Sequence, residues 1–319
     1  MPLDPRAQRL LSMVATATSE GRERPSPEQR RQSLAKLMQF ARNDLGPATT
    51  QDGHFPGPAG PLHFRLYTPA GHADDFSAPL PGFVYFHGGG LVAGSVETHD
   101  KIAAAIAVAS GCRLISIDYR LAPEHKFPAA IEDALASLQF VADHAVALGI
   151  DRNRIIVGGD SAGATLAAVV CQQNRSTTGV RIAAQCLLCP VLDFSRSWPS
   201  RELFATGYLI DAATWQADLA DCLADGTDVH DPRVSPLCSP DLSGLPPAVI
   251  HTAEFDPMRD EGNAYASRLT EAGITVAHVC HDGMVHNFHA LGAILPQAKT
   301  ALELIGRQIQ SLLHAATPR

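Results

Sequence analysis

The sequence lacks features that mark several other classes of protein. No apolar run approaches the roughly 18 residues that a membrane helix needs, so we expect no membrane span. No basic cluster is present and the net charge is -8, so nucleic acid is not an expected partner. Aromatic residues are scarce at 6%, yet 45% of the residues are hydrophobic and 18% are charged. A chain of 319 residues with this composition can bury a large core.

Cysteine is scattered and odd in number. The seven cysteines stand at positions 112, 171, 186, 189, 222, 238 and 280, so we expect no disulfide framework and a cytoplasmic protein with reduced thiols. Cys186 and Cys189 have C-x-x-C spacing inside an apolar, strand-like run. Residues three apart in a strand point to opposite faces, so a redox or zinc site is not predicted there.

The first 61 residues predict helices and a linker. Arg6 and Arg9 precede the apolar residues 10–15, which resembles a short signal peptide ending at 15–17. The apolar run is short and Asp4 lies in the basic region, so an amphipathic helix is the better interpretation. Residues 3–45 predict two helices around the polar turn at 25–27, and the Gly- and Pro-rich segment 51–61 predicts a linker.

Short apolar runs then alternate with helical stretches. The predicted strands are 63–68, 83–86, 114–117, 155–157, 186–192, 248–252 and 275–279. Several of these strands are apolar on consecutive residues, which is typical of parallel strands that are covered on both faces. The pattern predicts an α/β fold with a mostly parallel central sheet and helices on both faces. Residues 195–235, which contain both tryptophans, interrupt this rhythm and are either a lid over the site or an ordinary crossover helix.

The segment Gly159-Asp160-Ser161-Ala162-Gly163 carries the strongest chemical signal. It lies between the predicted strand 155–157 and the helix-like stretch 164–173. A strand, a G-x-S-x-G turn and a helix together describe a nucleophile elbow. Such a turn exposes the serine hydroxyl at a helix N-terminus, where the helix dipole favours negative charge. Ser161 is therefore the candidate nucleophile.

A serine nucleophile needs a base and a carboxylate that orients the base. In elbow enzymes the acid and then the histidine follow the serine along the chain. Asp256 lies at the exit of the predicted strand 248–252, whereas Glu254 is strand-like and Asp260 lies in the following helix. His281 and His286 both follow the last predicted strand, and spacing does not choose between them.

The four histidines at 278, 281, 286 and 289 could also be interpreted as a metal cluster. His278 lies in a predicted strand, where a residue three positions later points to the other face, and no carboxylate joins the set at ligand spacing. We therefore expect no metal and no cofactor.

The run His87-Gly88-Gly89-Gly90 follows the predicted strand 83–86. Glycines leave backbone N–H groups unobstructed, so this loop and Ala162 could form an oxyanion hole. An alternative is a dinucleotide fingerprint formed by Gly88, Gly90, Ala93 and Asp118. Residues 94–95 intervene where its helix should begin, and Asp118 comes 30 residues after Gly88 where about 20 are expected, so this alternative is weaker.

Five blocks together resemble the hormone-sensitive-lipase-like branch of the α/β-hydrolase esterases. They are 87–90 with 94–95 and 99–100, Asp118-Tyr119-Arg120-Leu121-Ala122-Pro123-Glu124, 159–163, 254–260 and 283–288, in family order. The resemblance implies an α/β-hydrolase catalytic domain at 51–319, with a helical cap from residues 1–50 and the insertion 195–235.

The resemblance also implies site residues. It makes Ser161 the nucleophile, Asp256 the acid and His286 the base in preference to His281. It makes Gly88, Gly89 and Ala162 the oxyanion donors. His87 would orient the glycine loop, and Arg120 and Glu124 would be scaffold residues, paired with each other or with loop backbone.

The implied activity is that of a serine carboxylesterase acting on small short- to medium-chain esters through an acyl-enzyme, without a cofactor. An amidase, lactonase or deacetylase would use the same triad. A small-molecule receptor is a further alternative, although receptors similar to this family lack the histidine that stands here at 286. An edge-strand homodimer is compatible with the sequence.

The chain departs from the family pattern at two positions. Asn287 stands where the family usually has Gly, but Asn tolerates unusual backbone angles. Leu91 stands where a bulky aromatic residue is frequent, which predicts a roomier pocket on that wall.

Overall fold

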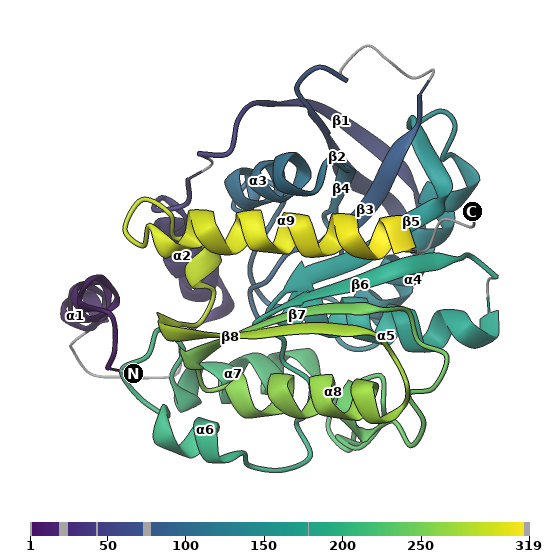
Figure 1. The fold of residues 1–319 in the computed structure, drawn as a ribbon. Helices are drawn as coiled ribbons and strands as arrows, with labels where there is room; N and C mark the ends of the chain where they lie inside the picture. The colour runs from purple at the N-terminus through teal and green to yellow at the C-terminus, as the bar shows by residue number, and fades with distance from the viewer. Residues whose placement is uncertain (1, 19–24, 43, 73–77, 178, 316–319) are drawn as a thin grey trace.

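The computed structural model describes residues 2–18, 25–42, 44–72, 78–177 and 179–315 (Figure 1). Its strands are β1 (Ala48–Gly57), β2 (Gly60–Pro69), β3 (Leu80–Phe86), β4 (Arg113–Ile117), β5 (Ile150–Asp160), β6 (Ile182–Leu188), β7 (Ala248–Phe255) and β8 (Val276–Val285). Its α-helices are α1 (Pro5–Thr18), α2 (Pro27–Met38), α3 (Asp100–Ser110), α4 (Ala129–Asp143), α5 (Ala162–Thr177), α6 (Pro199–Leu203), α7 (Ala212–Cys222), α8 (Arg259–Glu271) and α9 (Gln297–Ala315). Short 3-10 helices span Pro236–Cys238 and Phe288–Ala290.

The strands form one sheet in the order β1-β2-β4-β3-β5-β6-β7-β8 (Figure 1). β2 is antiparallel to both β1 and β4, and every pair from β4 through β8 is parallel. The predicted mostly parallel sheet is confirmed. The parallel strands bring their carboxyl ends to one edge, where ligands bind in open α/β sheets.

Helices cover both faces of the sheet, as predicted. Phe83 and Tyr85 of β3 pack in a buried cluster with residues of α3 and α9, while their neighbours Val84 and Phe86 pack with residues of α4, α5 and α8. Side chains alternate across a strand, so a strand covered on both faces buries consecutive residues. All five residues of β4 are accordingly buried. Among the described helices, none combines the length and apolarity that crossing a bilayer requires.

The predicted linker at 51–61 is wrong. β1 pairs with β2 along its whole length, and residues 57–60 close the hairpin. The glycines and prolines of this segment therefore make a tight turn and strand ends. Phe55 anchors β1, because its ring stacks on Phe140 of α4 at a centroid distance of 4.5 Å and its exposed fraction is 2%. Burying a large aromatic side chain stabilises the hairpin on the sheet.

Several strand boundaries also differ from the prediction, and two of these differences lie near the site. β6 ends at Leu188 rather than at 192, and Pro190, which has no backbone N–H to donate, lies just beyond it. β8 continues to Val285, so His281 lies inside the strand and not in the following loop. His286 is the first residue after β8.

The N-terminal helices agree with the prediction where the structure describes them. Ser26 begins α2 with a capping box, in which its hydroxyl accepts from the Gln29 amide and the Gln29 side chain accepts from the Ser26 amide.

Residues 195–235 contain two short helices, α6 and α7, so the interpretation as one long crossover helix is wrong. α6 is attached to α8 through the Ser200 amide, which donates to the Asp260 carboxylate over 2.8 Å.

Candidate active site

Ser161 lies on a sharp turn between β5 and α5, as the elbow motif predicts. Its φ is +52°, a left-handed conformation that non-glycine residues rarely adopt. The Ser161 amide donates to the Leu188 carbonyl over 2.8 Å and fixes the turn against β6. A Cβ on Gly159 or Gly163 would collide with the Phe86 carbonyl of β3, so glycine is required at both positions. The turn places the serine hydroxyl at the N-terminus of α5.

The structure brings Ser161, Asp256 and His286 together from three separate loops. His286 Nε2 lies 3.0 Å from Ser161 Oγ, and His286 Nδ1 lies 2.8 Å from Asp256 Oδ2. The other Asp256 oxygen accepts from the Met258 amide over 2.8 Å. The three residues are at most 4% exposed. With the carboxylate accepting from Nδ1, Nε2 is free to take a proton from the serine.

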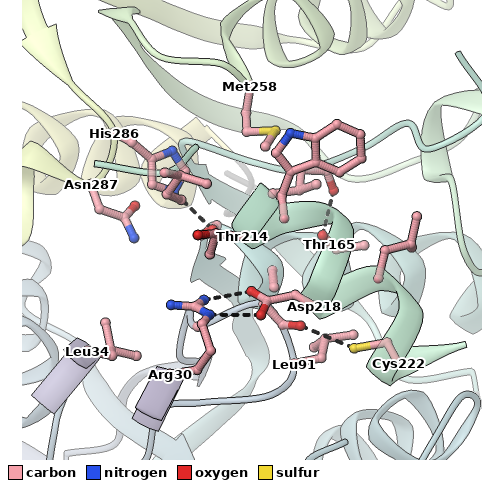
Figure 2. Close-up of a pocket in the computed structure, with 18 of the residues that line it drawn as sticks. Arg30, Leu34, Leu91, Thr165, Thr214, Asp218, Cys222, Met258, His286 and Asn287 are labelled. Atoms are coloured by element: carbon pink, nitrogen blue, oxygen red, sulfur yellow. Dashed lines mark hydrogen bonds and ion pairs between the residues drawn. The ribbon is translucent and has the colours of Figure 1, made fainter. Parts of the chain in front are cut away.

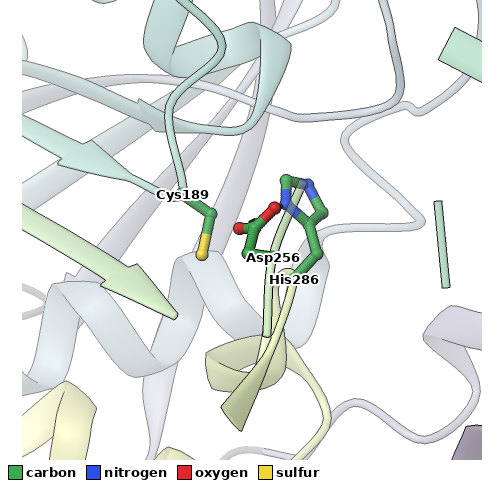
Figure 3. A group of neighbouring side chains, drawn as sticks. All are labelled: Cys189, Asp256 and His286. Carbon is green, nitrogen blue, oxygen red and sulfur yellow. Dashed lines mark hydrogen bonds and ion pairs between the residues drawn. The ribbon is translucent and has the colours of Figure 1, made fainter. Parts of the chain in front are cut away.

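A cysteine lies beside this carboxylate. Cys189 follows β6 with φ +45°, and its Sγ, an Asp256 oxygen and a His286 nitrogen all lie within 4.8 Å of one another (Figure 3). Burial, and then the Asp256 charge, raise the pKa of the Cys189 thiol well above its usual value. The thiol is therefore neutral at physiological pH.

Gly88 is wrongly assigned as an oxyanion donor. Its amide donates to Asp160 Oδ1 over 3.0 Å, so this N–H is already occupied, and Gly88 does not line the cavity. Gly89 and Gly90 do line it, together with Ala162. Within the described part of the chain, no acceptor engages the amides of these three residues. They are the N–H groups that remain available to a substrate oxygen.

Asp160 is a residue that the sequence analysis did not single out, although it precedes Ser161. It is fully buried and accepts hydrogen bonds from the Gly88 amide, the Tyr85 hydroxyl and the Asn287 side chain. Burial alone would raise the pKa of this carboxyl, but the neighbouring His99 and the hydrogen bonds lower the pKa below its usual value. Asp160 therefore remains ionised and connects the glycine loop with the elbow.

His87 contacts the glycine loop as predicted. Its ring lies with Nδ1 2.9 Å from the Gly88 carbonyl oxygen and stacks on Tyr119 at a centroid distance of 4.4 Å. The Tyr119 hydroxyl donates to the His87 carbonyl over 2.7 Å. Burial lowers the pKa of His87 to about 4, so the ring is neutral at pH 7. A neutral, stacked imidazole suits a structural role beneath the loop.

Arg120 and Glu124 do not pair with each other, which was one of the two arrangements expected for them. Arg120 instead binds Asp133 of α4 through Nε and Nη2, over 2.8–3.0 Å, and so ties its loop to that helix. Glu124 binds Arg31 of α2 through both carboxylate oxygens, over 2.7–3.0 Å. Both residues are scaffold, but their partners lie elsewhere in the chain.

His281 is not a base for Ser161. Its Nε2 lies 2.7 Å from Nδ1 of His251, and His251 Nε2 lies 2.7 Å from Gln308 of α9. Two groups among the described residues could offer three metal ligands, namely Cys189 with Asp256 and His286, and His63 with Glu97 and Asp118. Neither group contains His278, His281 or His289. The four C-terminal histidines therefore do not form one metal cluster.

Ser161 and His286 both line a cavity of about 640 Å³. Figure 2 shows His286 among the residues around it. α1, α2 and α7 contribute to its lining, and so do Leu91 and the residues that flank the elbow. Its walls are mostly aliphatic, from residues such as Leu10, Leu34 and Leu219, and a charged pair, Arg30 with Asp218, lies among them. A cavity of this size and polarity fits a small organic molecule.

The chain resembles known esterases along most of its length. A family model described as alpha/beta hydrolase fold matches residues 83–290. The chain is 40% identical to the esterase LipI of Mycobacterium tuberculosis over 77% of this chain and 76% of that protein. It is 36% identical to the ethyl acetate hydrolase of Pseudomonas putida over 83% of this chain and 81% of that protein. Among solved structures, the chain is similar to the ester-hydrolase EH1AB1 from the metagenome of Lake Arreo, which was solved in complex with a derivative of bipyridine phosphonate. The TM-score is 0.91 and the sequence identity is 41%, over 99% of this chain and 100% of that chain.

Proposed function

The chain belongs to the α/β hydrolase fold family as a carboxylic ester hydrolase of the hormone-sensitive-lipase-like branch, and from this premise we propose that Ser161, His286 and Asp256 are its catalytic triad. One observation carries the proposal. His286 Nε2 lies 3.0 Å from Ser161 Oγ while Nδ1 lies 2.8 Å from Asp256. This is the geometry in which an imidazole removes a hydroxyl proton.

Ser161 Oγ attacks the ester carbonyl carbon as His286 Nε2 takes the hydroxyl proton. The carbonyl oxygen becomes an oxyanion, and the amides of Gly89, Gly90 and Ala162 donate hydrogen bonds to it. His286 returns its proton to the alkoxy oxygen, the alcohol leaves, and the acyl group remains on Ser161. Water deprotonated by His286 then attacks the acyl-enzyme and releases the carboxylic acid.

The proposed substrates are short- to medium-chain esters. A largely aliphatic cavity of about 640 Å³ supports this, because it can enclose a modest acyl or alcohol chain but is small for a bulk lipid. We propose that residues 1–50 and 195–235 act as the cap. α1, α2 and α7 line the same cavity as Ser161, so these segments are well placed to exclude water during the reaction.

Two further expectations stay proposals. All seven cysteines are free thiols, which favours the cytoplasm. β8 is the last strand of the sheet on its side, so its outer edge is where a second copy could pair to form a homodimer. Sedimentation equilibrium of the purified protein tests the dimer.

Hydrolysis of p-nitrophenyl esters from acetate to palmitate tests the function, with Ser161→Ala beside the wild type. We expect turnover to peak at short or medium chains and to fall by at least 10³-fold in the variant. An organophosphate should label Ser161 stoichiometrically in the wild type. A folded wild-type protein that hydrolyses none of the esters would overturn the proposal.

A further inference from the structure

Two neighbouring residue pairs face each other across the active site. Asp160 ends β5 and Ser161 follows it, and His286 and Asn287 follow β8. His286 Nε2 lies 3.0 Å from Ser161 Oγ, and beside this contact the Asn287 Nδ2 amide donates to Asp160 Oδ2 over 2.9 Å. The loop that carries the base is therefore joined to the elbow twice, by consecutive residues on each side.

The acceptor of the second bond is firmly held. Asp160 is fully buried, and its other oxygen, Oδ1, accepts from the Gly88 amide over 3.0 Å and from the Tyr85 hydroxyl. Both donors belong to β3 and the glycine loop that follows it. Hydrogen bonds to an ionised acceptor are stronger than those between neutral groups. The side-chain amide of Asn287 thus binds the Asp160 carboxylate, which is also hydrogen-bonded to the glycine loop.

The backbone of Asn287 is held as well. Its φ and ψ are 51° and 26°, a left-handed conformation that Gly adopts freely and that Asn tolerates best among other residues. The Asn287 carbonyl also accepts a hydrogen bond from the Ala290 amide over 3.0 Å. Gly, which the family usually has here, would keep this backbone but would leave Asp160 Oδ2 without its amide donor. The side chain of Asn287 therefore makes a contact that Gly cannot make.

We propose that Asn287 is a positioning residue that holds His286 over Ser161 by anchoring the base loop to Asp160. The inference rests on the proposed function, because it assigns a task within the same triad. Asn287 does not transfer a proton. Its side chain restricts the movement of the loop, so His286 stays at hydrogen-bond distance from the nucleophile, and displacement of a reacting group by about 1 Å can cost 10²-fold in rate.

The test uses Asn287→Gly and Asn287→Asp in the full chain. Gly keeps the left-handed backbone and removes the anchor, and Asp keeps the shape but replaces the donor with a second anion against Asp160. We expect kcat on p-nitrophenyl butyrate to fall about tenfold in Asn287→Gly and further in Asn287→Asp, with KM within twofold of wild type. Phosphonylation of Ser161 by an organophosphate should slow in parallel. Asn153→Gly, at an exposed position, is the matched control.

Three outcomes would overturn the inference. The first is an unchanged kcat in Asn287→Gly. The second is a rise in KM alone, which would assign the side chain to substrate binding. The third is a loss of kcat no larger than the loss of folded protein measured by circular dichroism. Titration of active sites with the organophosphate measures the fraction of competent enzyme, and so distinguishes the third outcome from a true loss of kcat. A wild-type protein without ester turnover would overturn the proposed function, and this inference with it. An active wild type beside an unaffected Asn287→Gly would overturn the inference alone.

Discussion

Arg30 of α2 and Asp218 of α7 form a two-point ion pair across the wall of the cavity (Figure 2). Arg30 Nε lies 2.8 Å from Asp218 Oδ1, and Nη2 lies 2.6 Å from Oδ2. The side chains are only 17% and 9% exposed. A Cβ on Gly90 would collide with the Asp218 carboxylate, so the pair also lies against the glycine loop. One contact thus joins the N-terminal segment, the 195–235 segment and the glycine loop, whose Gly89 and Gly90 are the proposed oxyanion donors.

Breaking this pair should weaken substrate binding. Asp218→Ala leaves a mostly buried guanidinium without its partner, which costs a few kcal/mol, about 3–5 for fully buried pairs. We expect kcat/KM to fall about tenfold on every ester, mainly through KM, because the wall of the cavity loosens. Steady-state kinetics measures this. Arg152→Ala, which removes an exposed ion pair, is the control and should leave the kinetics unchanged. Equal kinetics for Asp218→Ala and wild type would show that the pair does not hold the wall.

The close approach between Gly163 and β3 predicts a severe effect from one methyl group. In Gly163→Ala the new Cβ would meet the Phe86 and His87 carbonyl oxygens, which belong to the backbone and cannot rotate away. We expect at least a 100-fold loss of kcat or a drop in melting temperature of several degrees. Gly292→Ala is the matched control, since its Cβ would find atoms no closer than 3.4 Å. Thermal unfolding and kcat measured on both variants decide the matter, and equal behaviour would contradict the steric argument.

Leu91 is expected to limit the length of chain that the cavity accepts. It lines the cavity directly after the glycine run, with φ +60°. Leu91→Ala removes about three methylene-sized groups from this wall, so the best p-nitrophenyl ester should be longer than for the wild type. Activity profiles from acetate to palmitate measure the shift. A wild type with a sharp limit at acetate, and no gain for longer esters in Leu91→Ala, would refute the roomier pocket expected from the sequence.

Local signals account for what the sequence predicted. The parallel sheet followed from apolar runs and the elbow from five consecutive residues, because both depend on neighbours in the chain. The hairpin at 51–61 was missed because turn-forming Gly and Pro residues look alike in a linker and in a tight turn. Of the three expected oxyanion donors, only Gly88 was misassigned, because Asp160 accepts from the Gly88 amide, a contact between residues 72 positions apart. The partners of Arg120 and Glu124 were likewise fixed by tertiary packing.

Stability should fall as the pH drops below about 6.5, and His289 should account for part of the loss. Burial lowers the pKa of His289 to about 4, and its two ring nitrogens find no hydrogen-bond partner among the described residues. In the unfolded chain the imidazole takes up a proton near its ordinary pKa of about 6.5. Between these two values the unfolded state binds a proton that the folded state does not. The contribution of neutral His289 to the free energy of unfolding is therefore complete above pH 6.5. It is lost as the pH falls, by up to about 1.4 kcal/mol per pH unit.

Replacing His289 with an apolar residue should remove this part of the acid sensitivity. His289→Leu cannot take up a proton, so the difference in unfolding free energy between pH 7.5 and pH 5 should shrink by about 2 kcal/mol relative to wild type. The remaining difference comes from other buried histidines, such as His251, whose pKa burial lowers to about 3. Urea unfolding at several pH values measures it, and His230→Leu, at an exposed position, is the control. Parallel pH profiles for wild type and His289→Leu would mean that the proton taken up on unfolding belongs to a different group.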